Sequence, residues 1–350
     1  MIKRIFIILG IVFSFSALEG KDSMDRSHPL LVIVDSDADI DDMMAIVYLL
    51  KNPRVDIKAI TTMGDGMSRY EYGAKNISNL LELVGRSHVP VAYGARKSLS
   101  PAGSFPSEWR TEVDQVMGIK LPENPVKPVH VKSSDLITEL VMKSPNKITL
   151  FCIGPLTNVA IALEKTPAIK DNIERIYFMG GAILSPGNIV GRPQGYRNQV
   201  AEYNIFLDAK AASDVFNSGV PITLVPLDAT DHAPITKEFY ERISQNRTTP
   251  AANFVYEVIK PFAQMQSRVR SYFWDPLAAV IMTNPDIATY RNLNLTINLR
   301  KGPEYGRVMM TKQGALVQVV TGVNAAAFYT LFLNTLNNHP NLKQNHNESK

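Results

Sequence analysis

Apolar and polar residues along this chain follow two alternating periods. Short runs rich in β-branched residues, typical of buried strands, recur between longer segments with apolar residues at helical spacing. We expect strands at residues 30–34, 56–62, 148–153, 174–179 and 221–226. We expect helices at residues 42–51, 71–85, 133–143, 157–164 and 208–218. This alternation predicts an α/β fold, a single large domain whose mostly parallel, Rossmann-like central sheet is flanked by helices.

Two long stretches fall outside the alternation. Residues 95–131 are rich in Pro, Gly and Ser and predict a long surface excursion, while residues 230–274 predict an irregular region with helical parts. Loops of this length in a compact domain are usually functional or disordered. Between these stretches, the turn Gly154-Pro155-Leu156-Thr157-Asn158 predicts a helix start with Thr157 as its cap.

The two ends of the chain differ from the rest. In residues 1–20, Lys3 and Arg4 precede an apolar stretch of about 14 residues that small or polar residues follow, which is typical of a secretory signal peptide. A transmembrane anchor is the alternative, but such a stretch is short for a bilayer. We therefore expect a secreted or periplasmic protein without a stable membrane anchor. Residues 28–336 are expected to form the folded domain, and residues 337–350 a polar tail.

The composition excludes some classes of protein. Apolar residues make up 45% of the chain and charged residues 20%, which is ordinary for a globular protein. The net charge of +4 comes from scattered Lys and Arg without a long basic run, so we expect no binding to nucleic acid. Cys152 is the only cysteine and lies in an expected strand, so it is interpreted as a core residue. The histidines show no spacing that specifies zinc.

A cluster of carboxylates directly follows the first expected strand. Its sequence is Asp35-Ser36-Asp37-Ala38-Asp39-Ile40-Asp41-Asp42. So much negative charge beside a buried strand repels itself unless a cation lies within it, and Ca²⁺ and Mg²⁺ both accept several carboxylate ligands. The carboxyl end of a strand is also where open α/β sheets bind their ligands. The alternative is a solvated acidic turn.

Two known motifs have carboxylates at a spacing similar to that of this cluster. The 1, 3, 5 spacing of an EF-hand is present, but Ile40 and Ile46 stand where that loop needs Gly and Glu. An Asp-x-Asp after a strand is also typical of haloacid-dehalogenase phosphatases, with Asp35 as nucleophile and Mg²⁺ as cofactor. That family has Thr or Val at the position of Asp39, so a phosphatase is kept only as an alternative.

Four blocks of the chain together resemble the inosine–uridine-preferring nucleoside hydrolases. Asp35-Ser36-Asp37 with Asp41-Asp42 resembles the amino-terminal calcium motif of that family. The other blocks follow in the family's order: Gly154-Pro155-Leu156-Thr157-Asn158-Val159-Ala160, then Met179-Gly180-Gly181 with Gly187-Asn188 and Ala201-Glu202-Tyr203-Asn204, then Trp274-Asp275-Pro276. The resemblance covers residues 30–335 and implies the nucleoside hydrolase fold.

Two departures from the family pattern affect the site. Ala38-Asp39 stand where many members have Pro-Gly, so we expect a differently shaped turn, and the role of the Asp39 charge is open. Trp274 stands where many members carry a His that acts as the leaving-group acid.

The resemblance implies Ca²⁺ as cofactor. It implies that the side chains of Asp37, Asp42 and Asp275 bind the ion, together with the backbone carbonyl of Ile153. The cation would lower the pKa of a bound water and fix its direction of attack. Asp37 is implied as the catalytic general base on that water; a role as metal ligand alone is the alternative.

Ribose recognition is implied for Asp41, Met179, Asn188, Glu202 and Asn204. Sites that pair with hydroxyl groups discriminate strongly against substrates that lack them, so a 2′-deoxy substrate is expected to bind poorly. For Glu202 and Asn204, the alternative is a capped turn before the helix expected at 208–218.

Contacts to the base are implied for Trp109, Trp274 and Asp65. Tryptophan at position 274 is similar to the purine-preferring branch, in which tryptophans stack on the base and favour its protonation at N7. The alternative is that both tryptophans belong to the core or its rim. Arg268, Arg270 and Tyr272 precede Trp274 on a segment that could close over the substrate; a plain surface role is the alternative.

Together these features predict an enzyme. The expected reaction is Ca²⁺-dependent hydrolysis of the N-glycosidic bond of ribonucleosides, purine ribonucleosides in particular, through a transition state that resembles an oxocarbenium ion. By analogy with the family we expect a homo-oligomer, a dimer or tetramer. The alternatives are an exported nucleoside-binding protein without turnover and the phosphatase described above.

Overall fold

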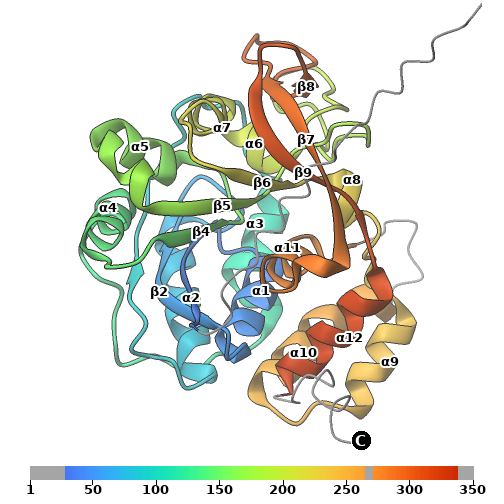
Figure 1. Ribbon diagram of the computed structural model, residues 1–350. Coiled ribbons are helices and arrows are strands. Elements are labelled where there is room, and N and C mark those ends of the chain that lie inside the picture. The colour runs from blue at the N-terminus through green and yellow to red at the C-terminus, as the bar shows by residue number, and fades with distance from the viewer. Residues whose placement is uncertain (1–27, 265–270, 338–350) are drawn as a thin grey trace, which may run out of the picture.

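One sheet runs through the part of the chain that the computed structural model describes, residues 28–264 and 271–337 (Figure 1). Within these residues it has nine strands in the order β3-β2-β1-β4-β5-β6-β9-β7-β8. Neighbours from β3 to β9 pair in parallel, and β7 pairs antiparallel with both β9 and β8. The predicted α/β domain with a mostly parallel sheet is confirmed.

The strands span β1 (Leu30–Ser36), β2 (Val55–Thr62), β3 (Val91–Ala92), β4 (Ile148–Cys152), β5 (Ile173–Met179), β6 (Ile222–Val225), β7 (Ala288–Ile297), β8 (Val308–Met310) and β9 (Ala315–Val323). The five predicted strands are confirmed to within two residues at each end. The short strand β3 and the three carboxyl-terminal strands were not predicted.

The helices span α1 (Ile40–Lys51), α2 (Tyr70–Leu83), α3 (Ser107–Asp114), α4 (Ser133–Lys143), α5 (Thr157–Lys165), α6 (Tyr203–Leu207), α7 (Ala209–Phe216), α8 (Leu227–Thr230), α9 (Lys237–Gln245), α10 (Pro250–Gln264), α11 (Trp274–Thr283) and α12 (Ala325–Leu336). Short 3₁₀ turns are η1 (Val116–Gly118), η2 (Pro167–Asn172) and η3 (Pro285–Ile287). The five predicted helices are confirmed to within two residues at each end. The excursion at 95–131 contains α3 and η1, and the region at 230–274 contains α9 and α10, which pack beside α12 (Figure 1).

The strand order reverses between β1 and β4. From β1 the chain continues to β2 on one side, whereas from β4 it continues to β5 on the other. Such a point leaves a crevice at the carboxyl ends of the two strands, where α/β sheets bind ligands. Asp35 of β1 pairs with Cys152 of β4, so the acidic cluster after β1 and Ile153 after β4 meet at this point.

Helix α1 is buried on nearly all sides because it lies between the sheet and the helices α11 and α12. Every residue from Met43 to Leu50 is buried, which agrees with a helix that is apolar all round. This packing gives the first turn of α1, with its carboxylates, a fixed place.

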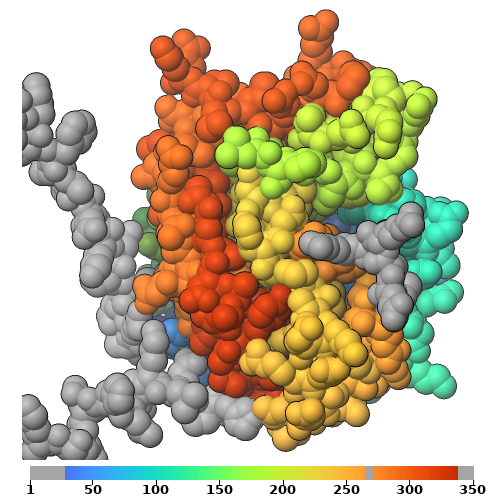
Figure 2. Space-filling model, turned by 90° about the vertical axis from the view of Figure 1, so that its right-hand side faces the viewer, coloured from blue at the N-terminus to red at the C-terminus, as the bar shows by residue number. Residues whose placement is uncertain are grey.

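The carboxyl-terminal hairpin covers the loop that follows β5. Asn198 Nδ2 donates to the carbonyl of Tyr305 at 2.7 Å. In Figure 2 the yellow-green segment before α6 lies beside the orange hairpin of β7 and β8 at the top of the molecule. The antiparallel strands thus support the loop in which Asn188 lies.

Two details of the expected boundaries were wrong. Thr157 does not cap a helix; it is the first residue of α5, and its hydroxyl donates to Asp208 Oδ2 at 2.6 Å, because Asp208 needs donors where it caps α7. Asn337 belongs to the fold, since it ends α12 and its Oδ1 accepts from the N–H of Thr248 at 2.7 Å. The expected signal peptide and the rest of the expected tail lie outside the described residues. Among the helices described, none has the length and apolar character needed to cross a membrane.

Candidate active site

Three carboxylates from distant parts of the chain converge at the carboxyl edge of the sheet. Asp41 and Asp42 lie in the first turn of α1, and Asp275 lies in the first turn of α11, which packs against α1. One oxygen from each of the three lies within 4.8 Å of the others. The amino ends of both helices favour negative charge there.

These carboxylates have no basic partner to offset their charge. Among the described residues, no lysine, arginine or histidine forms an ion pair with Asp41, Asp42 or Asp275. Burial, followed by the charges of neighbouring carboxylates, raises the pKa of all three well above the usual value. Such an arrangement is costly without a cation.

Asp275 has a buried oxygen that tests whether this group fits a cation. Its Oδ1 is buried and has no hydrogen-bond partner in the described part of the chain. A buried carboxylate oxygen normally has a partner, and carboxylate oxygens are the ligands of hard divalent cations. Asp41, Asp42 and Asp275 therefore fit a metal site of the Ca²⁺ or Mg²⁺ type.

Asp37 lies next to this group but is not one of the three. It is buried, its Oδ2 accepts from the N–H of Met67 at 2.9 Å, and its own N–H donates to Asp42 Oδ1 at 3.1 Å. Burial, and then the charge of Asp41, raises the pKa of Asp37 to about 7, which the Met67 bond opposes. A carboxylate with such a pKa suits a general base near neutral pH. Its metal-ligand and catalytic roles stay predictions.

Asp35 has a supporting place in the structure. Its Oδ1 accepts from Thr61 Oγ1 at 2.6 Å and from Asn158 Nδ2 at 2.8 Å, and burial raises its pKa to about 6. These bonds join β1 to β2 and α5. Ser36 Oγ donates to Asp42 Oδ1 at 2.5 Å and so orients a member of the carboxylate group.

The remaining part of the expected metal site is Ile153. It follows β4, is buried, and its N–H donates to the carbonyl of Asp35 at 2.8 Å, so it lies beside the end of β1. Its carbonyl as a Ca²⁺ ligand stays a prediction.

The structure assigns a place to Asp39, whose role was open. Asp39 is the amino-terminal cap of α1, and its Oδ1 accepts from the N–H of Ile40 at 2.6 Å. The preceding residue, Ala38, has a φ of 59°, a left-handed conformation that a residue with a side chain rarely adopts. The turn therefore has an unusual backbone at Ala38, next to Asp37.

Four residues expected to bind ribose form one group beyond β5. Glu202 caps α6: its carboxylate accepts from the N–H groups of Asn204 at 2.7 Å, Ile205 at 3.2 Å and Gly181 at 2.8 Å. Asn204 Nδ2 donates to the carbonyl of Met179 at 3.1 Å, and Asn188 Oδ1 accepts from the N–H of Tyr203 at 3.0 Å. The capped turn is thus confirmed, although before α6 rather than at 208–218, and ribose binding stays a prediction.

An electrostatic interaction links this group to the fifth expected ribose residue. Burial is the main cause that raises the pKa of Glu202 to about 7, and the charge of Asp41 adds to it. Asp41, a member of the carboxylate group, is therefore close enough to Glu202 to affect its pKa.

The expected base-binding residues lie on three different elements, and one of them, Trp274, adjoins Asp275. Trp274 begins α11, its Nε1 is buried without a partner among the described residues, and its ring centroid lies 5.7 Å from that of Tyr272. Trp109, on α3, is 41% exposed, which leaves its ring free for a ligand. Asp65 follows β2, and its Oδ2 accepts from the N–H of Ser98 at 2.6 Å.

Part of the segment expected to close over the substrate is visible. Arg268 and Arg270 lie outside the described residues. Tyr272 forms a bridge with Pro234, and Phe273 N–H donates to the carbonyl of Ala233 at 2.8 Å. The backbone just before Trp274 is thus held in place by Ala233 and Pro234.

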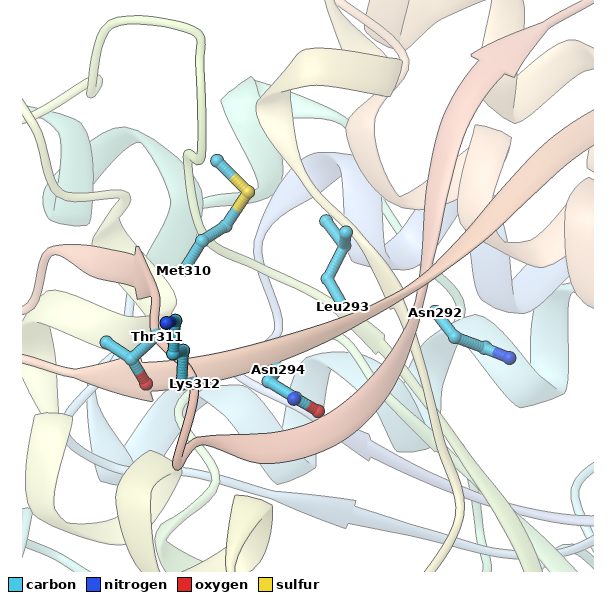
Figure 3. Close-up of a pocket in the computed structure, with 6 residues that line it drawn as sticks. All are labelled: Asn292, Leu293, Asn294, Met310, Thr311 and Lys312. Carbon is cyan, nitrogen blue, oxygen red and sulfur yellow. The ribbon is translucent and has the colours of Figure 1, made fainter. Parts of the chain in front are cut away.

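A pocket of about 370 Å³ lies away from the carboxylates. It is at the antiparallel edge of the sheet, between β7 and β8 (Figure 3). The lining residues are Asn292, Leu293, Asn294, Met310, Thr311 and Lys312. None of these is an acid, so this pocket lacks the groups of the candidate site.

Sequence reasoning missed several residues that hold the site. Gly66 lies so close to Asp37 that a Cβ on Gly66 would overlap its side chain, and a Cβ on Gly154 would lie 2.7 Å from the Asp37 nitrogen. Arg110 holds the loop that contains Gly66. The sequence analysis named Gly154 only as part of a turn, the Gly64-Asp65-Gly66 turn after an expected strand was a usable signal for Gly66, and no local signal distinguished Arg110.

Comparison with known families agrees with this arrangement. The sequence pattern of the inosine-uridine preferring nucleoside hydrolases matches residues 32–330. This chain belongs to that family. It is therefore an enzyme, a ribonucleoside hydrolase, and the phosphatase and the binding protein without turnover are set aside.

Some relatives of this nucleoside hydrolase are named as pyrimidine-specific and others as purine-preferring. A pyrimidine-specific ribonucleoside hydrolase of Shewanella sp. (strain MR-7) is 31% identical over 87% of this chain and 95% of the relative. The pyrimidine-specific enzyme of Citrobacter koseri is 32% identical over 74% of this chain and 81% of its own. The structure of the purine-preferring ribonucleoside hydrolase from Gardnerella vaginalis has a TM-score of 0.76 at 27% identity and covers 88% of this chain and 98% of its own.

Proposed function

We propose that this enzyme is a Ca²⁺-dependent hydrolase of purine ribonucleosides that releases the free base and ribose. The observation that carries the proposal is the meeting of three carboxylates with a buried, unpartnered oxygen on Asp275. Together with Asp37 and the Ile153 carbonyl, these groups offer the oxygen ligands that Ca²⁺ prefers. When bound, the ion supplies positive charge that orients hydroxyl groups and makes water more acidic.

Asp37 is proposed as the general base. The Met67 N–H bonds one of its oxygens and so fixes the orientation of the carboxylate that is proposed to accept a proton from the attacking water. Removal of such a base typically costs a factor of about 10² to 10⁴ in rate.

Ribose hydroxyls are proposed to bind between Asp41 and the turn that Glu202 caps. The carboxylates of both residues accept hydrogen bonds, and Asn188 and Asn204 offer amide groups beside them. The turn is held by three bonds to Glu202, so its polar groups are arranged before the substrate arrives.

The purine preference rests on the two tryptophans. Trp274 adjoins Asp275, and Trp109 adjoins Arg110, which holds the loop against Asp37. Trp274 thus borders the proposed metal site and Trp109 offers an exposed ring on α3, and the two indoles are proposed to stack on a departing base and stabilise its protonated form. A pyrimidine preference is the second candidate, because the relatives at 31% and 32% identity are named pyrimidine-specific.

Initial rates of ribose release from inosine, guanosine, uridine and cytidine, with and without a chelator, test the proposal. We expect Ca²⁺-dependent turnover that is faster with purines, and a loss of about 10² to 10⁴-fold in Asp37→Ala. Asp56→Asn is the control, since Asp56 lies near the start of β2, at the opposite end of the strand from the carboxylates, and its half-exposed side chain pairs with Lys58. Full activity of Asp37→Ala contradicts the mechanism.

Base preference has a separate test in the same assay. Trp274→Ala should slow purine release while ribose inhibits the variant as well as the parent. Equal rates of the parent enzyme with uridine and inosine contradict the purine preference and leave the hydrolase itself intact.

We further propose export and self-association. The amino-terminal segment with Lys3 and Arg4 before an apolar stretch supports export, and mass spectrometry of the protein from the periplasm or medium should find residues up to about 20 removed.

Light scattering should give the mass of a dimer or tetramer rather than one 38.9 kDa chain.

A further inference from the structure

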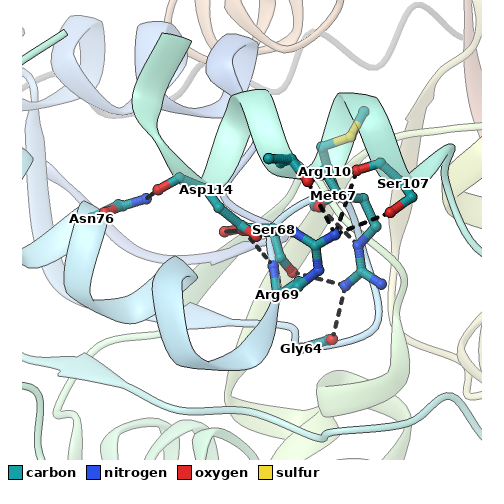
Figure 4. A network of polar contacts seen from close by, with 9 residues as sticks. Gly64, Met67, Ser68, Arg69, Asn76, Ser107, Arg110 and Asp114 are labelled. Carbon is teal, nitrogen blue, oxygen red and sulfur yellow. Dashed lines mark hydrogen bonds and ion pairs between the residues drawn. The ribbon is translucent and has the colours of Figure 1, made fainter. Parts of the chain in front are cut away.

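Arg110 on α3 turns its side chain toward the loop 64–68 that follows β2 (Figure 4). Its Nε donates to the carbonyl of Met67 at 3.1 Å, and its Nη2 donates to the carbonyls of Ser68 at 3.4 Å and Gly64 at 3.5 Å. One guanidinium therefore joins three carbonyls of a single loop, which suits the planar fork of arginine.

The same loop holds Asp37 through its N–H groups. Met67 N–H donates to Asp37 Oδ2 at 2.9 Å, and Ser68 N–H donates to the carbonyl of Asp37 at 3.0 Å. Gly66 packs directly on the Asp37 side chain. The peptide groups of this loop thus connect the Arg110 guanidinium to the Asp37 carboxylate.

The last residue of α3, Asp114, is bonded to Ser68 and Arg69, at the end of the same loop. Asp114 is buried, forms an ion pair with Arg69 and accepts from Ser68 Oγ at 3.1 Å (Figure 4). Its carbonyl also accepts from Asn76 Nδ2 at 3.0 Å. Helix α3 is therefore fixed to the segment 64–69 at both of its ends and cannot shift without moving that segment.

Charge as well as shape favours this placement of Arg110. Burial, and then Arg69, lowers the pKa of its guanidinium, while the negative charges of Asp114, Asp65 and Asp37 oppose that change. Arg110 is half-buried beside the acidic site, but it bonds to backbone carbonyls rather than to a carboxylate. Its main effect is therefore to orient the loop rather than to neutralise an acid.

We propose that Arg110 is a positioning residue for Asp37: it holds the loop 64–68 in place, and the loop in turn orients the Asp37 carboxylate. This inference rests on the proposed function of Asp37.

The test compares Arg110→Ala and Arg110→Lys with Arg54→Ala in the full-length enzyme. Arg54 is a matched control because it is a half-buried arginine at the opposite end of β2, where its Nη2 donates to Asn284 Oδ1 at 2.6 Å. The measurements are kcat, KM, the melting temperature and hydrogen exchange of the peptide that contains Met67 and Ser68.

We expect Arg110→Ala to lower kcat about tenfold to a hundredfold, since small misplacements of a catalytic group have effects of this size. KM should change by less than about threefold, because ground-state binding is largely retained. Exchange of the Met67 and Ser68 amides should become faster without substrate, while Arg54→Ala leaves kcat and this exchange unchanged. Arg110→Lys should lie between, as an ammonium cannot bridge three carbonyls.

Parental kcat and parental exchange in Arg110→Ala overturn the inference. If Arg110→Ala does not fold, Arg110→Lys decides: faster exchange with lower kcat supports the positioning role, and parental values refute it. The proposed function fails separately, when Asp37→Ala turns over as fast as the parent. The exchange measurement still tests the loop in that case, because it needs no substrate.

Discussion

Gly66 and Asp37 pack directly against each other in the proposed catalytic site. The loop after β2 passes directly over the Asp37 side chain, and only a residue without Cβ fits there. Met67, the next residue, donates the bond that orients the carboxylate. The position of the Asp37 side chain thus depends on Gly66 having no side chain.

Gly66→Ala is therefore predicted to lower kcat by about a hundredfold while the protein stays folded, because a misplaced catalytic group can cost that much. Gly73→Ala is the control: its Cβ would lie 3.4 Å from that of Ala38, an ordinary contact, and it sits inside α2. Steady-state kinetics and circular dichroism provide the comparison. Normal kcat in Gly66→Ala shows that the close approach to Asp37 has no catalytic importance.

At the scale of the elements, the start of the short helix α6 depends on one side chain. Glu202 is 2% exposed and accepts three backbone N–H bonds, one of them from Gly181 after β5. It thus joins the end of a strand to the start of a helix. Asn204, in the first turn, is held in the same arrangement by the Met179 carbonyl.

Glu202→Gln is predicted to destabilise the protein by about 2 kcal/mol, because an amide accepts fewer of these bonds and leaves a buried N–H unpaired. Urea unfolding measures the change in the free energy of unfolding. Glu238→Gln, on the exposed first turn of α9, serves as control and should change it by less than about 0.5 kcal/mol. Equal stability of the two variants contradicts the role assigned to the cap.

For the whole molecule, the acidic group couples metal binding to stability. Asp41 and Asp42 lie on α1 and Asp275 lies on α11, and these helices pack together. The three carboxylates therefore meet only in the folded state, so a cation that binds them binds the folded state and not the unfolded one. Calcium at a hundred times its Kd should therefore raise the free energy of unfolding by about 2.7 kcal/mol. Thermal unfolding at increasing Ca²⁺ concentrations checks this, and an unchanged melting temperature contradicts the proposed site.

The stability of the chelated protein should also depend on pH. Burial and mutual repulsion raise the pKa of Asp37 from 3.8 to about 7, and Asp41, Asp42 and Asp275 shift in the same direction. The folded state then binds more protons than the unfolded state, so stability is present at low pH and is lost as pH rises from about 4 through about 7. Urea unfolding in chelator at pH 5 and pH 8 measures the loss. Greater stability at pH 8 contradicts this prediction.

Local patterns determined much of this protein. The apolar runs predicted five strands and five helices, because buried elements in a parallel sheet are apolar along their length. They did not reveal β7, whose residues are mostly exposed or half-buried and whose sequence has no apolar run. Its pairing with β9 and β8 comes from contacts that no short window contains.

The residue types and order of the four family blocks likewise predicted the family and the carboxyl-rich site. The tertiary structure alone decided that Asp275 meets Asp41 and Asp42, that Glu202 caps α6, and that Arg110 reaches the loop over Asp37. Each depends on how separate elements pack, since α1 and α11, or α3 and the loop after β2, are adjacent in space and distant in the chain. Periodicity and motifs report what a segment can form; packing decides which side chains meet.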